Sequence, residues 1–212
     1  MSYYPICLNL DYKKVVIVGG GHVARQKLQS LLPTKAEIVI ISPVIVPEIE
    51  AYIQQGAATW YEKHFEASDL DGAALIFAVT NLEEINDAVE QATQHWQLLS
   101  RADAKGRVDF INPAVVRRGD FLLTASTSGA SPTLTRKVKE ELSAAYDEAY
   151  EQYVAFLKQA RFELMDTIQE PTIRKQALQT LVSSEILEWI REGNTKKCEE
   201  FLQQLLQKEI TR

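Results

Sequence analysis

Cysteine and long apolar stretches are scarce in this chain of 212 residues, and each scarcity excludes a class of protein. The two cysteines, Cys7 and Cys198, lie far apart and form no CxxC motif, so the sequence indicates neither a disulfide framework nor a zinc site. The longest apolar run covers residues 73–79, which is too short to cross a bilayer, and the N-terminus lacks the basic flank of a signal peptide. We therefore expect a cytoplasmic protein with no membrane partner.

Histidine is equally rare. His22, His64 and His95 form no HxH or HxxxH pair of the kind that binds metals. We therefore expect no dedicated metal site.

Glycine and proline are few and unevenly placed. Three of the nine glycines are consecutive, at residues 19–21, whereas residues 133–212 hold only Gly193 and Pro171. Because glycine and proline mark turns and loops, this distribution predicts an N-terminal part with many turns and a C-terminal part of longer helices. A chain of this length can form two modest domains.

Positive charge is in deficit. The chain has 23 basic and 29 acidic residues, and only 9 basic residues against 14 acidic ones precede Pro113. Such a charge distribution repels a phosphate backbone, and no basic cluster interleaved with aromatic residues appears. We therefore expect no nucleic-acid partner, although basic residues can still gather locally around an anionic small molecule.

The N-terminal part alternates short β-branched runs with helical stretches, the pattern of βαβ units on a parallel sheet. The predicted strands cover residues 4–10, 15–18, 38–41, 58–61, 75–79, 98–102 and 121–125, and the clearest helices cover residues 22–32, 47–54 and 83–96. The strand at residues 75–79 is almost entirely apolar, as expected for a strand covered on both faces.

The C-terminal part has the pattern of helices. Ser131 followed by Pro132 is typical of a helix start, since the serine can cap free N–H groups and proline loses nothing at the first helical position. Residues 131–168 fit either one long helix or two helices with a bend between them. Further helices are predicted at residues 173–182, 184–191 and 195–210.

A glycine loop follows the strand predicted at residues 15–18. The sequence KKVVIVGGGHVA leads from a strand into Gly19-x-Gly21-x-x-Ala24 at a helix start, which is the dinucleotide-binding fingerprint in its expected context. Gly19 permits the tight turn, Gly21 lets a pyrophosphate approach the backbone, and Ala24 lets the helix pack closely on the strand. The free N–H groups of the helix start then meet the anion. A bare strand-to-helix turn is the alternative.

The end of the second strand and the end of the apolar strand complete the predicted cofactor site. Ser42 and Pro43 occupy the place where an acidic residue usually holds the ribose, so NAD and NADP are not separated by the standard argument, and the lack of a nearby cation favours NAD. Thr80 and Asn81 follow the apolar strand at the sheet edge where a dinucleotide passes, with a turn and helix cap as the alternative. The residues predicted to bind the cofactor are Gly19, Gly21, His22, Val23, Ser42, Pro43, Val44, Thr80 and Asn81.

Asp103 follows the strand predicted at residues 98–102, at the same edge of the sheet. A carboxylate in that position would face the nicotinamide end of a bound cofactor, although a lone aspartate after a strand often serves only as a turn or cap. Arg101 beside it favours the ionised form of the carboxylate.

Four segments, in this order and spacing, resemble the precorrin-2 dehydrogenase family. They are GGGHVARQK at residues 19–27, AVTN at 78–81, ADAKGRVDFINPA at 102–114 and STSGASPTLTRKVKEEL at 126–142. This family comprises stand-alone enzymes of sirohaem synthesis and the N-terminal module of multifunctional sirohaem synthases. The resemblance covers about residues 1–145, and the Ser-Gly-Ala-Ser-Pro turn is far more specific than the glycine loop. The chain departs from the family at Ser100 and Arg101, where Asn and an apolar residue are common, and at Ala104.

The resemblance implies an NAD-dependent oxidoreductase that converts precorrin-2 to sirohydrochlorin, with Asp103 as general base. It also implies a homodimer. The expected fold is α/β, with a Rossmann-type parallel sheet in residues 1–112, a dimerisation segment in residues 113–146, and an all-helical domain in residues 147–212 that completes the tetrapyrrole site.

The implied substrate carries many carboxylates and needs local Arg and Lys side chains. Arg136 and Lys137 come first, because Ser131 and Pro132 place them on the opening turns of a helix. For each basic residue a solvated surface charge is the alternative, and Ser128 could instead satisfy backbone groups in its turn. The residues predicted to bind the substrate are Lys105, Arg117, Ser128, Arg136 and Lys137.

Two other functions stay open at this point. One is a bifunctional enzyme that also inserts Fe²⁺ or Co²⁺ into the product. The other is an NAD(H)-sensing regulatory module with a helical dimerisation arm, which the acidic charge and the lack of a helix-turn-helix pattern disfavour. The sequence does not distinguish sirohaem from a cobalamin precursor as the end product.

Overall fold

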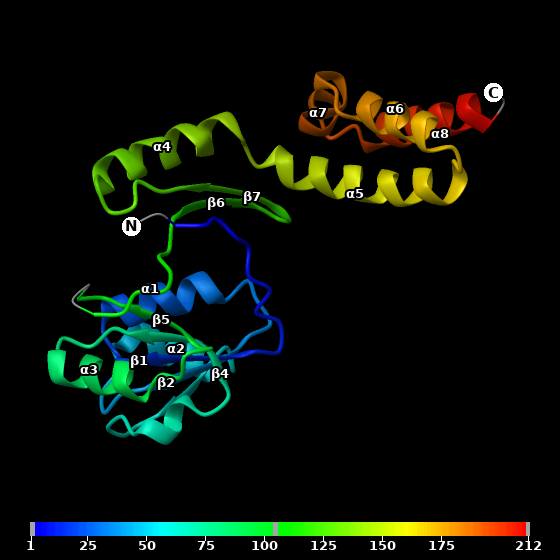
Figure 1. Ribbon diagram of the computed structural model, residues 1–212. Coiled ribbons are helices and arrows are strands. Elements are labelled where there is room, and N and C mark those ends of the chain that lie inside the picture. Colours follow the sequence, from blue (N-terminus) through cyan, green and yellow to red (C-terminus); the bar gives the residue numbers. More distant parts are fainter. Residues whose placement is uncertain (1–2, 104–105, 211–212) are drawn as a thin grey trace. The chain divides into compact units, whose positions relative to one another are not determined.

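The computed structural model describes residues 3–103 and 106–210. The chain divides into two compact units, Met1–Asn112 and Pro113–Arg212, and Figure 1 shows their elements in sequence colours.

The N-terminal unit is built on a parallel sheet of five strands. The strands are β1 (Lys14–Val18), β2 (Glu37–Ile41), β3 (Thr59–Tyr61), β4 (Ala73–Ala78) and β5 (Leu98–Arg101), in the order β3-β2-β1-β4-β5. All four pairings are parallel, so the carboxyl ends of the strands share one edge. The predicted fold class is confirmed, and the sheet order is that of a doubly wound α/β domain.

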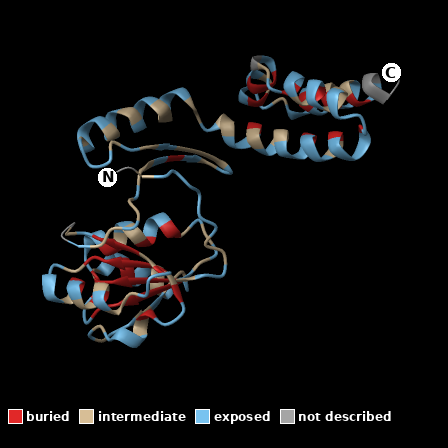
Figure 2. Ribbon diagram, viewed as in Figure 1, coloured by how far each residue is buried: buried red, intermediate tan, exposed pale blue. Residues whose placement is uncertain are grey.

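The sheet is the core of this unit. Its central strands are buried almost throughout, and Figure 2 shows them as the buried centre of the unit. Ile17, Leu28 and Phe77 pack in a cluster on one face, and Val16, Ile76 and Leu99 pack in a second cluster on the other. Because both faces are covered, the strands read as continuous apolar runs.

Four helical segments connect the strands. They are α1 (His22–Leu31), α2 (Pro47–Gln54), a short 3-10 helix (Ala67–Leu70) and α3 (Glu83–Ala92). The helix predicted at residues 83–96 ends four residues early, because Thr93 adopts an extended backbone and its hydroxyl donates to the Val89 carbonyl at 2.7 Å.

The C-terminal unit joins a hairpin to five helices. Strands β6 (Ala114–Arg118) and β7 (Phe121–Ala125) pair antiparallel, and the helices are α4 (Pro132–Ala145), α5 (Ala149–Thr167), α6 (Pro171–Leu181), α7 (Ser184–Arg191) and α8 (Thr195–Ile210). Phe121 of β7 stacks on Tyr150 of α5 with ring centroids 5.5 Å apart. Leu164, Leu181 and Ile186 lie in the common core of α5 to α8. The two-helix alternative for residues 131–168 is therefore the observed one.

One strand prediction was wrong, and a second predicted strand belongs to a different sheet from the one expected. Residues 4–10 form no strand, although Tyr4, Ile6, Leu8 and Leu10 alternate as in a half-buried strand, because this segment pairs with no described strand and the first three of these side chains are exposed. Residues 121–125 do form a strand, but it pairs with β6 in a separate sheet rather than joining the parallel one. No described helix combines the length and apolar character that a membrane span requires.

Candidate functional site

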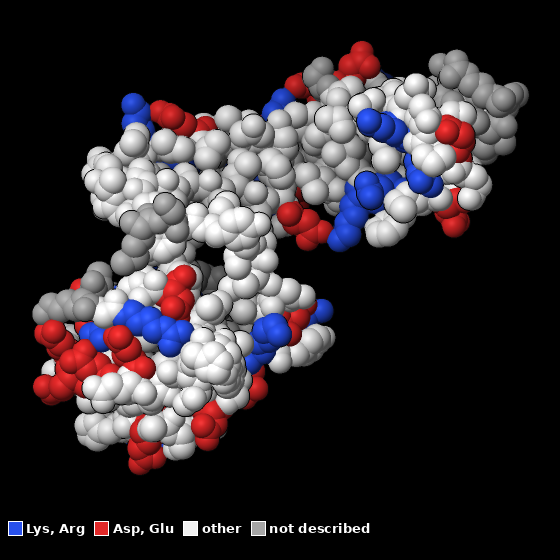
Figure 3. All heavy atoms as spheres, viewed as in Figure 1, with Lys and Arg blue, Asp and Glu red and all other residues white. Residues whose placement is uncertain are grey.

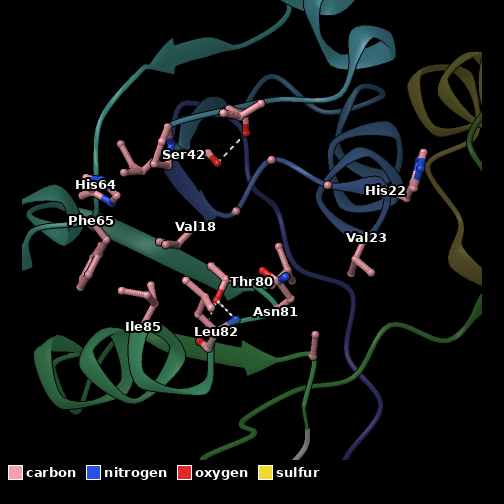
Figure 4. A pocket seen from close by; sticks show the side chains of 18 residues that line it. Val18, His22, Val23, Ser42, His64, Phe65, Thr80, Asn81, Leu82 and Ile85 are labelled. Atoms are coloured by element: carbon pink, nitrogen blue, oxygen red, sulfur yellow. Dashed lines mark hydrogen bonds between the residues drawn. The ribbon is translucent and has the colours of Figure 1, made fainter.

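A cavity of the N-terminal unit lies at the carboxyl edge of its sheet. Strands β1 and β4 are neighbours there although β2 and β3 come between them in sequence, so the loops that follow them turn to opposite faces and leave a crevice. The cavity has a volume of about 710 Å³, within the usual range for a small-molecule site. In Figure 4, His64 and Phe65 lie at one side of this pocket and His22 and Val23 at the other.

The first two positions of the glycine loop after β1 leave no room for a side chain. Gly19 has φ +127°, and a Cβ atom there would lie 2.9 Å from the Val79 carbonyl oxygen. A Cβ on Gly20 would overlap the Val44 carbonyl oxygen and lie 2.8 Å from the Ser42 hydroxyl. The Gly20 carbonyl also accepts a hydrogen bond of 2.8 Å from the Val46 N–H, so the loop is fixed against the end of β2.

Gly21 differs from its two neighbours because no atom lies within 4 Å of where its Cβ would stand. It is the N-cap of α1, no side chain caps that helix, and its first turn contains no acidic residue. The free N–H groups and the positive end of the helix dipole therefore point to an open space, which suits a pyrophosphate. On this observation the residues present fit a dinucleotide.

The segment after β2 forms the part of the pocket where the ribose of a dinucleotide would lie. The Ser42 hydroxyl donates to the Val44 carbonyl at 2.7 Å, which closes a tight turn, and the Val44 side chain is 74% exposed. Among the described residues that line the pocket there is no Lys, Arg, Asp or Glu. This uncharged lining carries no cation for a ribose phosphate.

Asn86 of α3 holds the turn after β4. Its amide oxygen accepts hydrogen bonds from the Thr80 N–H at 3.2 Å and from the Thr80 hydroxyl at 2.9 Å, and its amide nitrogen donates to the Thr80 carbonyl at 3.1 Å. The side chain is only 1% exposed. The same amide nitrogen donates to an Asp103 carboxylate oxygen at 3.0 Å, so Asn86 joins a pocket residue to Asp103.

Arg101 is the last residue of β5 and contacts Asp103. Its Nε donates to Asp103 Oδ1 at 3.0 Å and its Nη2 to Oδ2 at 2.8 Å, while Nη1 contacts Asp87 at 2.8 Å and Glu90 at 2.6 Å. The hydrogen bonds to Asp103 first, and then those to Glu90 and Asp87, raise the pKa of Arg101 above its ordinary value, and burial only partly opposes them. The guanidinium is therefore a permanent cation.

The acidic residues of α3 dominate the charge near this cluster. Figure 3 shows acidic side chains gathered over the α3 side of the N-terminal unit, where the helix carries Glu83, Glu84, Asp87 and Glu90. Among the residues that the structure describes, no group of three or more His, Cys, Asp or Glu side chains is arranged to hold a metal ion.

The pocket brings together every residue predicted from sequence to bind the cofactor. Ala102 also lines it, so Asp103 follows a pocket residue directly. Their contact with a cofactor stays a prediction. Those residues are Gly19, Gly21, His22, Val23, Ser42, Pro43, Val44, Thr80 and Asn81.

The predicted substrate residues lie elsewhere. Lys105 falls outside the described residues. Arg117, on β6, and Arg136 and Lys137, on the first two turns of α4, are exposed in the C-terminal unit, and Ser128 lies in the turn before α4 with φ +51°. Lys137 pairs with Glu141 at 3.8 Å on the same helix. Their contact with a substrate also stays a prediction.

Sequence reasoning missed several residues of the site. Gly20, His64, Phe65 and Ile85 line the pocket, and Asn86 supports it. Gly20 could have been found from its place between two fingerprint positions and Asn86 from a polar residue on the otherwise apolar face of α3. His64 and Phe65 follow a short edge strand and carry no local signal.

A parallel sheet with a glycine loop and a crevice at its switch point defines a Rossmann-type dinucleotide-binding protein. A family model described as "Putative NAD(P)-binding" matches residues 6–114. The chain thus contains an NAD(P)-binding domain.

Comparison with known proteins narrows the class to one family. A precorrin-2 dehydrogenase of Priestia megaterium is 33% identical over 202 residues, which cover 95% of this chain and 98% of that protein. The solved structure titled "SirC, precorrin-2 dehydrogenase" superimposes with a TM-score of 0.82 at 30% identity and covers 96% of this chain and 98% of that one. "Siroheme synthase 1" of Aeromonas salmonicida is 31% identical over 88% of this chain, which spans 40% of that longer protein. The chain belongs to the precorrin-2 dehydrogenase family, and the resemblance seen in its motifs is confirmed.

Proposed function

We propose that this protein oxidises precorrin-2 to sirohydrochlorin with NAD, as a step toward sirohaem or a cobalamin precursor. The observation that carries the proposal is the full-length similarity to a precorrin-2 dehydrogenase, together with a carboxylate, Asp103, adjoining the candidate cofactor pocket. The nicotinamide ring supplies the hydride acceptor.

Asp103 is the proposed general base. Loss of a hydride leaves a cationic macrocycle, and a fixed carboxylate can both stabilise this cation and take up its proton. The side chain of Asp103 is 20% exposed, and its carboxylate is held by Arg101 and Asn86. No cysteine or histidine nucleophile is required.

NAD is the proposed cofactor. The described pocket lining contains neither Lys nor Arg at the end of β2, so a ribose phosphate would meet no countercharge. The free ribose hydroxyl of NAD needs no countercharge.

The C-terminal unit is proposed to supply the dimer contact and the substrate carboxylate contacts. In this proposal residues 113–146 form the dimerisation segment, and residues 147–212 complete the tetrapyrrole site. Two Arg and one Lys on β6 and α4 are exposed and suited to bind carboxylates, since charge-assisted hydrogen bonds to Arg are strong and often bidentate. Together with Ser128 and Lys105 they form the proposed substrate set, namely Lys105, Arg117, Ser128, Arg136 and Lys137.

The experiment that tests this function is anaerobic incubation of the protein with precorrin-2 and either NAD or NADP. We expect sirohydrochlorin absorbance and reduced nicotinamide together, with NAD used far more efficiently than NADP. Absence of reduced nicotinamide with authentic precorrin-2 would contradict the proposed dehydrogenase activity.

A further inference from the structure

Arg101 is a buried cation at the carboxyl end of β5. The free-energy cost of burying its charge needs an explanation. The side chain is only 2% exposed, and its guanidinium lies among the carboxylates of Asp87, Glu90 and Asp103. Removing a charge from water costs several kcal/mol, and an ion pair seldom returns more than that cost. Replacing a whole buried ionic cluster by well-packed apolar side chains often costs no stability, so stability alone does not account for Arg101 and the carboxylates around it.

Arg101 contacts Asp103 in a bidentate geometry and uses its remaining nitrogen for two other carboxylates. The Nε and Nη2 groups of Arg101 each meet a different Asp103 oxygen, at 3.0 and 2.8 Å, whereas Asp87 and Glu90 share the remaining Nη1. A planar guanidinium that donates twice to one carboxylate fixes the plane of that carboxylate as well as its charge. Asp87 and Glu90, both on α3, anchor the other end of the guanidinium.

Asn86 fixes the same carboxylate from the side of the cofactor pocket. Its amide donates to Asp103 Oδ2 at 3.0 Å, and its oxygen accepts from Thr80, which lines the pocket. The amide cannot flip without losing the Thr80 N–H and Thr80 hydroxyl bonds, so its nitrogen is held toward Asp103. Thr80, Asn86, Asp103 and Arg101 thus form one continuous polar network.

We propose that Arg101 and Asn86 are positioning residues that keep the Asp103 carboxylate ionised and oriented beside the cofactor pocket. This inference rests on the proposed function, since it assigns Asp103 a part in the reaction. The described charged groups that face Asp103 are Arg101 from β5 and, through Arg101, Asp87 and Glu90 from α3. Arg101 contacts both carboxylate oxygens of Asp103 directly, whereas Asp87 and Glu90 contact Arg101.

The test is the ionisation of Asp103 and the pH profile of turnover in Arg101 variants. Aspartate labelled with ¹³C at its carboxyl group reports each carboxyl by NMR, and the Asp103 signal is the one lost in Asp103→Asn. In Arg101→Gln, which keeps a polar side chain in the cluster but removes the charge, we expect the titration midpoint of Asp103 to rise by about 1–3 pH units. The acid limb of kcat/KM with precorrin-2 should rise by the same amount.

Two further variants separate positioning from folding. Arg101→Lys keeps the charge, so the Asp103 titration midpoint should lie closer to that of wild type than to that of Arg101→Gln. Lysine cannot donate in the bidentate geometry. Lys63→Met is the matched control, because Lys63 also bridges two carboxylates, Glu66 and Asp69, both at 2.9 Å, but neither lines the pocket nor contacts the Asp103 cluster. It should leave both the Asp103 midpoint and the acid limb unchanged.

An Asp103 midpoint that is the same in wild type and Arg101→Gln would overturn the proposal. So would a shifted midpoint with an unchanged acid limb, because Arg101 would then hold Asp103 without consequence for the reaction. Failure of the proposed function is distinguishable, since the wild-type protein would then not turn over precorrin-2 while the NMR titration still reports the midpoint.

Discussion

At the scale of single residues, Gly20 and Gly21 show how neighbouring glycines can be required for different reasons. A side chain on Gly20 would collide with the Val44 backbone, whereas a side chain on Gly21 would enter open space. Gly21 also has φ −86° and ψ −168°, a conformation open to any residue. We therefore infer that Gly20 is required for folding and that Gly21 is required for cofactor binding.

This difference gives a paired prediction. We expect Gly20→Ala to destabilise folding by about 1–3 kcal/mol, because the backbone around Val44 must move. Gly21→Ala should change the free energy of unfolding by less than about 0.5 kcal/mol and yet raise the Kd for NAD by about tenfold or more. Denaturant unfolding and cofactor titration measure the two effects, and a Gly21→Ala variant with unaltered NAD affinity would place the pyrophosphate elsewhere.

Sequence reasoning located the cofactor residues because the fingerprint ties each glycine to a local backbone task. It did not find the contact of Asn86 with Asp103 or the contacts of Arg101 with α3, since those contacts bring together residues 11 to 17 positions apart. Asp103 was found only as a residue at the end of a strand. Its partners depend on how α3 packs, which local patterns do not encode.

At the scale of elements, helix starts were more predictable than helix ends. Ser131 was expected to cap a helix, and its hydroxyl accepts the Leu134 N–H of α4 at 3.2 Å. Glu170 caps α6 in the same way, with an Ile173 N–H bond of 2.6 Å, although glutamate is not a preferred cap and was not expected there. The hairpin of β6 and β7 was missed although its Gly119-Asp120 turn is a known signal, because Arg117 and Arg118 obscure the apolar pattern of β6.

The Glu170 cap makes the stability of the protein depend on pH. Hydrogen bonds from the Ile173 and then the Thr172 backbone lower the pKa of Glu170 from its ordinary value of 4.5. Because the pKa is depressed in the folded state, the cap stabilises α6 fully above pH 4.5 and is lost as the pH falls through the folded-state pKa. We expect the Tm of Glu170→Gln to fall less steeply than that of wild type on acidification below this pH.

A matched variant for that measurement is Glu192→Gln, which changes an exposed glutamate that follows α7. Its Tm should track that of wild type across the acid range. Parallel curves for wild type and Glu170→Gln would show that the cap carries no pH dependence.

At the scale of the whole molecule, the hairpin is the element least able to stand alone. A sheet of two strands is marginal in water, and both of its edges lack a paired strand among the described residues. Val116 is buried, whereas Val115 on the opposite side of β6 is 37% exposed. A second copy of the chain covering this side is consistent with the proposed dimerisation segment at residues 113–146.

The dimer can be tested on that exposed side of β6. We expect Val115→Glu to shift the protein from dimer to monomer in sedimentation velocity, because the new charge would be buried against the partner. Val182→Glu, at a position that is 68% exposed after α6, serves as the control and should leave the dimer intact. A wild-type protein that sediments as a monomer would exclude the proposed segment from assembly.

The central claim is that this protein removes a hydride and a proton from precorrin-2, with Asp103 beside the nicotinamide. The most direct measurement is the stoichiometry of reduced nicotinamide to sirohydrochlorin, taken with wild type and with Asp103→Ala. We predict one reduced nicotinamide for each sirohydrochlorin in wild type, and in Asp103→Ala a turnover lowered by about 10² or more with cofactor binding retained. Sirohydrochlorin formed without reduced nicotinamide, or Asp103→Ala turning over at the wild-type rate, would contradict it.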